Sequence, residues 1–224
     1  MTVSTKFSIL LLGKKDDEGC AKAVDFVETH FSKVEVHLGS WGDPLPDSVE
    51  LWEGDYIFSY LSRWVLPAII IEKARVAAIN FHPASPDYPG IGCNNFALYE
   101  GATEFGVTCH YMANRVDTGN IVAVKRFPVY SKDDVCSLLK RTYDCQLDLF
   151  REILALILSG RSLPNSNETW SREPFTREEL NDLALISPDM NKDEISRRVR
   201  ATNYREFRPC VELAGYVFEL VSEK

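Results

Sequence analysis

The chain has 224 residues, of which 45% are hydrophobic and 26% are charged, and its formal net charge is -8. Such a composition supports a sizeable core, argues against disorder, and fits one large domain with a small appendage. The acidic balance argues against a broad nucleic-acid surface, which needs clustered lysine and arginine. The six cysteines form no CxxC pair, and no apolar stretch approaches the length of a membrane span. We therefore expect a soluble, cytoplasmic protein with reduced thiols.

The first 82 residues alternate short apolar runs with helical patterns. The first run is buried in character and ends at Gly13. Strands alternating with helices form parallel sheets with right-handed crossovers. The sequence therefore predicts an α/β fold with a Rossmann-like, mostly parallel sheet flanked by helices. The predicted strands are 7–12, 34–38, 56–60 and 76–81, and the predicted helices are 18–31 and 65–74.

The middle of the chain continues this pattern after a loop rich in turn formers at 83–92. A short helix at 94–99 and two strands at 106–112 and 120–129 follow. Residues 131–134 then offer a cap to a long helix that reaches about residue 158.

The character of the sequence changes near residue 160, after which 165–174 is polar and irregular in pattern. Thr176-Arg-Glu-Glu179 is a capping box, and a second helix start lies at 191–194. Residues 211–220 predict a hairpin with its turn near Ala214-Gly215. We divide the chain into a sheet domain at 1–160 and a C-terminal extension at 161–224, made of two short helices and a β-hairpin.

Three polar residues stand where open α/β sheets bind their ligands. Asn80 and His82 are spaced i, i+2 at the carboxyl end of a predicted parallel strand, so both side chains point to one face. Asp117 follows a later strand. An amide, an imidazole and a carboxylate can stabilise an oxyanion, move a proton and orient the base, which is a set suited to acyl transfer. Each of the three has a structural alternative when taken alone. Asn80 could tie loops together, an isolated histidine near a strand end such as His82 is usually structural, and Asp-Thr-Gly is a common turn.

Other polar motifs are weaker indications of function. Gly13-Lys14-Lys15 follows the first strand but lacks the pattern of a phosphate-binding loop. His30 and His37 are interpreted as structural. Gly90-Ile-Gly92 is interpreted as a turn.

Three segments resemble the folate-dependent formyltransferases, which use N10-formyltetrahydrofolate. They are Ser62-Arg-Trp-Val-Leu-Pro67, Asn80-Phe-His82-Pro83, and 106–121, which contains Gly-Val-Thr-Cys-His and Val-Asp-Thr-Gly-Asn-Ile. Their order and spacing agree with the family from about residue 7 to 158. The resemblance implies catalytic roles for Asn80, His82 and Asp117, with Thr108 and His110 packing or orienting nearby, and no metal.

The resemblance also implies where the folate donor binds. Its pterin is expected beside two segments, recognised largely through backbone groups. Trp64 has an alternative as a core residue. The predicted cofactor-binding residues are Arg63, Trp64, Val65, Met112, Ala113, Asn114 and Val116.

The acceptor amine is the open question within this family. The acidic chain and short C-terminal part disfavour tRNA, and the loop after Pro83 differs from that of the purine enzymes. The extension resembles that of sugar N-formyltransferases, so we favour an amino-sugar nucleotide, with methionyl-tRNA, phosphoribosylglycinamide or a non-catalytic folate-binding role as alternatives. Arg197, Arg198 and Arg200 could contact a diphosphate, or lie on a solvated helix face. The hairpin could form a homodimer.

Overall fold

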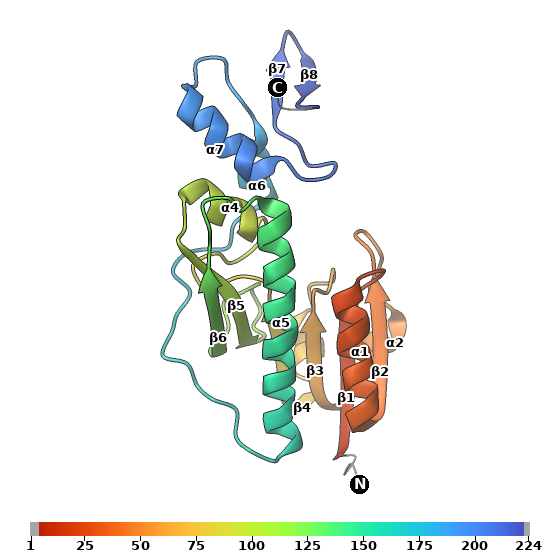
Figure 1. Ribbon diagram of the computed structural model, residues 1–224. Coiled ribbons are helices and arrows are strands. Elements are labelled where there is room, and N and C mark those ends of the chain that lie inside the picture. Colours follow the sequence, from red (N-terminus) through yellow and green to blue (C-terminus); the bar gives the residue numbers. More distant parts are fainter. Residues whose placement is uncertain (1–4, 222–224) are drawn as a thin grey trace.

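A six-stranded sheet forms the centre of the computed structural model, which describes residues 5–221 (Figure 1). The strand order is β2-β1-β3-β4-β5-β6. Strands β1 to β4 pair in parallel, whereas β5 pairs antiparallel with both of its neighbours, β4 and β6. The predicted Rossmann-like, mostly parallel sheet is confirmed. The strands are β1 (Thr5–Lys14), β2 (Phe31–Gly39), β3 (Gly54–Tyr60), β4 (Ala74–His82), β5 (Glu104–Tyr111) and β6 (Ile121–Pro128).

Helices cover both faces of the sheet because its central strands are apolar on both sides. In β1, Ile9 and Leu11 pack in the cluster under α1 (Glu18–His30) and α5 (Val135–Leu158). Leu10 and Leu12 alternate to the opposite face. There they pack with α2 (Asp47–Leu51) and α3 (Ala68–Ile71). Within residues 5–221, every helix is too short or too polar to cross a membrane.

The helix predicted at 65–74 was wrong in length, and α2 was not predicted. Only Ala68–Ile71 is helical, Pro67 stands before it as the N-cap, and β4 begins at Ala74. The run of isoleucines at 69–71 is β-branched and has a weak helix preference, and the early start of β4 leaves no room for a longer helix. Residues 61–66 therefore remain non-helical beside the carboxyl end of β4.

The C-terminal extension contains the two predicted helices, α6 (Arg177–Ala184) and α7 (Lys192–Thr202), and the predicted hairpin of β7 (Cys210–Leu213) and β8 (Tyr216–Glu219). The helices pack on α4 (Cys93–Glu100), and the ring of Phe175 stacks on that of Phe96 with centroids 3.6 Å apart. The division at residue 160 thus marks a change of sequence character, while one hydrophobic cluster crosses it. All six cysteines carry free thiols.

Candidate active site

The register of the sheet positions two of the three expected catalytic side chains. On β4, Asn80 lies between Ser59 of β3 and His110 of β5 as a direct cross-strand neighbour of both. His82 is two residues further, at the end of the strand. Both alternate to the face opposite α5. Asn80 and His82 therefore lie on one face of the sheet, as their i, i+2 spacing predicted.

Asp117 reaches the same place through a tight turn after β5. Its φ of 48° lies in the left-handed region. Two residues later the backbone of Gly119 passes so close to Tyr111 that a Cβ on Gly119 would stand 1.8 Å from the Tyr111 carbonyl oxygen. Only glycine fits there. The turn directs the Asp117 carboxylate back toward the end of β4.

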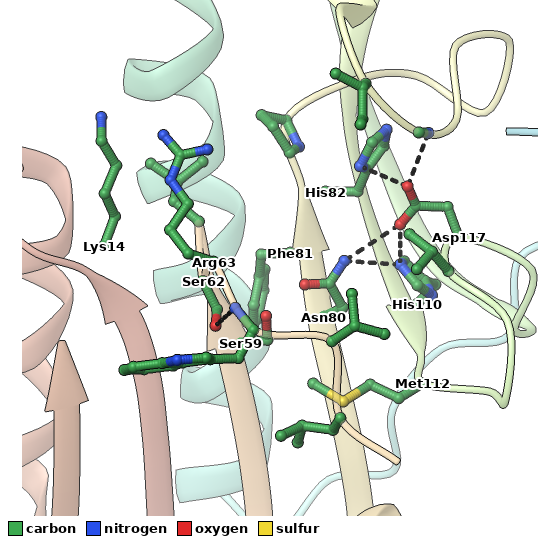
Figure 2. Close-up of a pocket in the computed structure, with 18 of the residues that line it drawn as sticks. Lys14, Ser59, Ser62, Arg63, Asn80, Phe81, His82, His110, Met112 and Asp117 are labelled. Atoms are coloured by element: carbon green, nitrogen blue, oxygen red, sulfur yellow. Dashed lines mark hydrogen bonds and ion pairs between the residues drawn. The ribbon is translucent and has the colours of Figure 1, made fainter. Parts of the chain in front are cut away.

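The Asp117 carboxylate is the centre of the site (Figure 2). Its Oδ2 lies 3.2 Å from Nδ1 of His82 and accepts a hydrogen bond from the Gly90 backbone N–H at 2.9 Å. Its Oδ1 lies 3.3 Å from Nε2 of His110 and 3.4 Å from Nδ2 of Asn80. The structure thus brings Asn80, His82 and Asp117 together, with His110 as a fourth member.

Burial and charge set the protonation of this cluster. His82 and Asp117 are each 4% exposed. Burial lowers the pKa of His82, with Asp117 and the Tyr88 carbonyl acting in the opposite direction. Burial alone would raise the pKa of Asp117, but His82, His110 and the Gly90 N–H together hold it below its usual range. At neutral pH the pair is a carboxylate beside a neutral imidazole.

Both ring nitrogens of His82 face oxygen acceptors. Nε2 lies 3.0 Å from the Tyr88 carbonyl oxygen, and Nδ1 faces Asp117. A neutral imidazole can donate to one of them only. If His82 takes up a second proton, both of its N–H groups have an oxygen acceptor. The ring is therefore suited to accept a proton during a reaction.

The amide of Asn80 is held on its nitrogen side. Its Nδ2 lies 3.0 Å from Nε2 of His110, whose Nδ1 donates to the Tyr111 carbonyl oxygen at 2.8 Å. The carbonyl oxygen of Asn80 therefore points away from Asp117 (Figure 2). Rotating the terminal side-chain bond of Asn80 by about 180° would exchange its carbonyl oxygen and its NH2 group. The NH2 group would then stand as a donor where the oxygen now lies.

A cavity of about 380 Å³ opens beside the cluster. Its volume is within the range of small-molecule sites. Asn80, His82 and Asp117 line it, as do Lys14 and Arg63, which lie together across from the cluster (Figure 2). Six of the seven predicted cofactor-binding residues also line it, namely Arg63, Trp64, Val65, Met112, Ala113 and Val116.

One predicted residue lies outside the cavity lining, and Trp64 has further contacts besides it. Asn114 lies in the same turn, exposed, and is not among the lining residues. Trp64 lines the cavity and also packs against Gly39, with its Nε1 donating to the Asp43 carbonyl oxygen at 2.9 Å. Trp64 therefore packs against the fold and borders the cavity, and its contact with the folate stays a prediction. Within residues 5–221, no cluster of three or more His, Cys, Asp or Glu side chains has a metal-binding arrangement.

The basic residues of α7 serve the fold. Arg198 binds Glu194 and the carbonyl groups at the end of α6, and Arg200 donates to the Asp133 and Tyr130 carbonyl oxygens. Arg197 pairs with Glu194. None of these three arginines lines the cavity.

Sequence reasoning missed several contacts of the cluster. Tyr88 and Gly90 act through backbone groups, which carry no side-chain signal. Trp170 stands in the segment interpreted as irregular, yet its ring lies against both His82 and His110. The importance of His110 could have been found by pairing the predicted strands, because Asn80 and His110 are in register.

Comparison with known proteins identifies the domain that carries this site. A family model described as formyl transferase matches residues 45–154, which include the whole cluster. This segment, which is about half of the chain, is therefore similar to formyl transferases. The resemblance noted in the sequence is confirmed at the level of the family.

Individual relatives differ in acceptor. The methionyl-tRNA formyltransferase of Levilactobacillus brevis is 32% identical over 147 residues, which is 64% of this chain and 44% of that protein. The chain therefore spans less than half the length of this curated relative.

Solved structures share the fold across nearly the whole chain. A sugar N-formyltransferase from a Shewanella species aligns with a TM-score of 0.76 at 17% identity, covering 95% of this chain and 96% of that one. An N-formyltransferase from Helicobacter canadensis, in complex with folinic acid and dTDP-3-aminofucose, aligns with a TM-score of 0.72 at 19% identity, covering 93% of this chain and 84% of that one.

Proposed function

We propose that this chain transfers the formyl group of N10-formyltetrahydrofolate to the amine of an amino-sugar nucleotide. The observation that carries the proposal is the buried Asp117 carboxylate in contact with His82 and Asn80 beside a cavity large enough for a small-molecule donor. A relative of the same fold has been solved with folinic acid and dTDP-3-aminofucose, which supports a folate donor and a nucleotide-linked amino sugar as acceptor.

The reaction exchanges one carbon–nitrogen bond for another. The neutral acceptor amine attacks the formyl carbon, and a tetrahedral oxyanion forms. The amine then loses a proton, N10 of the folate gains one, and the bond between the formyl carbon and N10 breaks. Most of the rate acceleration should come from positioning, because the protein must hold the amine, the formyl carbon and the proton acceptor close together.

Each residue of the cluster has a role in this scheme. His82, neutral and bordered by acceptors on both ring nitrogens, takes the amine proton and passes it toward N10. Asp117 raises the proton affinity of His82 and orients its ring. Asn80 offers its amide N–H to the developing oxyanion after rotation about its terminal side-chain bond.

The folate is proposed to bind along the non-helical segment at 63–65 and the turn at 112–116. Because α3 is short, residues 61–66 remain non-helical beside the cavity, where the Trp64 N–H donates to the Ser62 hydroxyl at 3.2 Å. Extended backbone offers alternating N–H and C=O groups that match the edge of a pterin.

Methionyl-tRNA is the main alternative acceptor, favoured by the sequence relative from Levilactobacillus brevis. The net charge of -8 favours a small acceptor over a polyanion. A folate-binding protein without catalysis would have no use for a carboxylate buried between two imidazoles.

The proposal is tested by incubating the protein with N10-formyltetrahydrofolate and a panel of amino-sugar nucleotides, charged tRNA and phosphoribosylglycinamide. Mass spectrometry identifies which acceptor gains a formyl group. His82→Ala should lower turnover by a factor on the order of a hundred or more. His37→Ala is the matched control, because His37 pairs with Glu35 and does not line the cavity. Release of formate with no acceptor present would instead mean a hydrolase.

We also propose that the hairpin mediates a homodimer. Leu213, Tyr216 and Phe218 are 50%, 70% and 56% exposed. Apolar side chains gathered on a short exposed hairpin are typical of a contact surface.

A further inference from the structure

The segment at 163–175 returns from the end of α5 to the candidate active site, and it lies outside the residues that match the family model. It has no regular secondary structure, apart from an isolated bridge between Phe175 and Gly90. The segment is nevertheless anchored by backbone hydrogen bonds from Ser166 to Ile121 at 3.0 Å and from Ser171 to Pro86 at 3.1 Å.

The same segment fixes the loop that contacts the catalytic groups. Phe175 donates its N–H to Pro89 at 2.9 Å, and the N–H of Ile91 returns to Phe175 at 3.0 Å. Between these two bonds lies Gly90, whose N–H binds Asp117. Two ion pairs add to the anchoring, between Glu173 and Arg115 and between Glu168 and Arg126.

Trp170 is the one side chain of this segment with ring contacts to the cluster among the described residues. Its ring meets that of His110 edge to face, with centroids 5.0 Å apart and an interplanar angle of 89°. It meets that of His82 with centroids 5.7 Å apart at 72°. Its Nε1 donates to the Gly119 carbonyl oxygen at 2.8 Å. The indole thus touches both imidazoles and also holds the turn that directs Asp117.

We propose that Trp170 is a positioning residue, which covers the two imidazoles against water and fixes the Asp117–Gly119 turn. The indole is half-buried and lies against both imidazole rings, where it keeps water from them. Apolar cover strengthens the electrostatic coupling between His82 and Asp117. The placement of Trp170 stands on geometry, and its catalytic consequence rests on the proposed function.

The titration of His82 tests the placement without any assay of activity. Asp117 and His110 face His82, and so does the Cys93 thiol, with its Sγ 3.7 Å from Nε2. Burial raises the pKa of that thiol, so it stays neutral across the range. Removing the indole admits water and relieves the burial that lowers the pKa of His82. The midpoint should rise by about half a unit or more in Trp170→Ala.

The experiment follows the four histidine rings by NMR between pH 4 and 8 in wild type, Trp170→Ala and Thr169→Ala, with His82 assigned by its loss in His82→Ala. Thr169 is the exposed neighbour and controls for changes to the backbone. We expect an upward shift of His82 in Trp170→Ala only. If that variant does not fold, Trp170→Leu serves instead, because leucine covers less of the two imidazole rings and lacks the N–H that donates to the Gly119 carbonyl oxygen.

Turnover gives the second readout. In Trp170→Ala, kcat should fall by ~10-fold or more with KM for the folate changed less than about twofold, because orientation and not binding is lost. An unshifted His82 together with unchanged kcat in a folded variant would overturn the proposal. A shifted His82 in a protein that transfers no formyl group would support the placement and refute the proposed function.

Discussion

At the scale of single residues, the site depends on one carboxylate that serves two imidazoles. Asp117 contacts His82 through Oδ2 and His110 through Oδ1. A carboxylate shared in this way must stay ionised, and the Gly90 N–H helps to keep it so. The proposed chemistry therefore depends on a negative charge held in place by a turn that only glycine at position 119 permits.

Replacing this charge should separate catalysis from binding. In Asp117→Asn, the amide lacks the negative charge that raises the proton affinity of His82, so kcat should fall by on the order of a hundredfold or more. Folate affinity, measured by isothermal titration, should change little. Asp25→Asn, on the exposed face of α1, is the control. A large loss of affinity with kcat retained would mean that Asp117 binds the donor and does not assist the chemistry.

The pH dependence follows from the direction of the His82 shift. Burial lowers the pKa of His82 below its ordinary value of 6.5. The neutral ring, which accepts the proton, therefore persists to lower pH than in an exposed histidine. The acid limb of the kcat profile should lie below about pH 6.5. The free energy of unfolding should also decrease as the pH falls. The reason is that His82 and Asp117 bind protons more readily in the unfolded chain than in the folded one. An acid limb above pH 7 would contradict this assignment.

At the scale of elements, α5 is the longest support of the sheet, and its start is fixed by a cap. Asp134 accepts from the Ser137 N–H at 2.8 Å, and the Ser137 hydroxyl accepts from the Asp134 N–H at 3.0 Å. Asp134→Ala should cost about 1 kcal/mol and lower Tm by about 2–4 °C in calorimetry. Asp148→Ala, exposed within the helix, should not lower Tm. Equal losses in both variants would show that the cap contributes nothing of its own.

Elements with a clear local signal could be predicted from the sequence, and those set by neighbours could not. The hairpin and the capping box at Thr176 have turn and cap residues at fixed spacing, and both are present. The length of α3 depends on where β4 enters the sheet, which is a tertiary constraint with no signature in residues 65–74.

The site divides in the same way. Asn80, His82 and Asp117 follow from spacing and resemblance, because their side chains differ from the apolar background of the strands. The contact of Trp170 with the cluster could not be predicted, because its segment has no periodic pattern. The segment follows α5 in the chain and returns to the cluster only through the tertiary fold. Backbone contacts such as that of Gly90 depend on loop conformation, which the residue types do not determine.

At the scale of the whole molecule, the extension has two parts that differ in their contacts. The helices α6 and α7 share a hydrophobic cluster with α4 and β5, through Leu180, Leu183 and Ala201. The hairpin is largely exposed, and it is joined to the rest through a backbone hydrogen bond from Ile186 to Cys210 at 2.7 Å. The first part belongs to the folded core, whereas the second is available for contact with another molecule.

Removal of the residues after Arg208 should therefore convert a dimer to a monomer while the fold survives. Sedimentation velocity gives the assembly state, and circular dichroism checks the fold. Phe218→Ser is the milder variant, since Phe218 is exposed on β8 and contributes to the proposed contact. If the truncated protein sediments as the same assembly as the full chain, once the lost mass is taken into account, the hairpin has no role in dimerisation.

The pairing of Asn80 with His110 has a consequence for how this site can change over time. Both side chains belong to the ladder between β4 and β5, where one strand runs antiparallel to the other. Sliding either strand by a single residue would turn every side chain on it to the far side of the sheet. The distance between the Asn80 amide and the His110 imidazole is thus set by the pairing of the two strands. Insertions in the connecting stretch around Gly101, where a side chain would meet open space, should leave the reacting groups aligned.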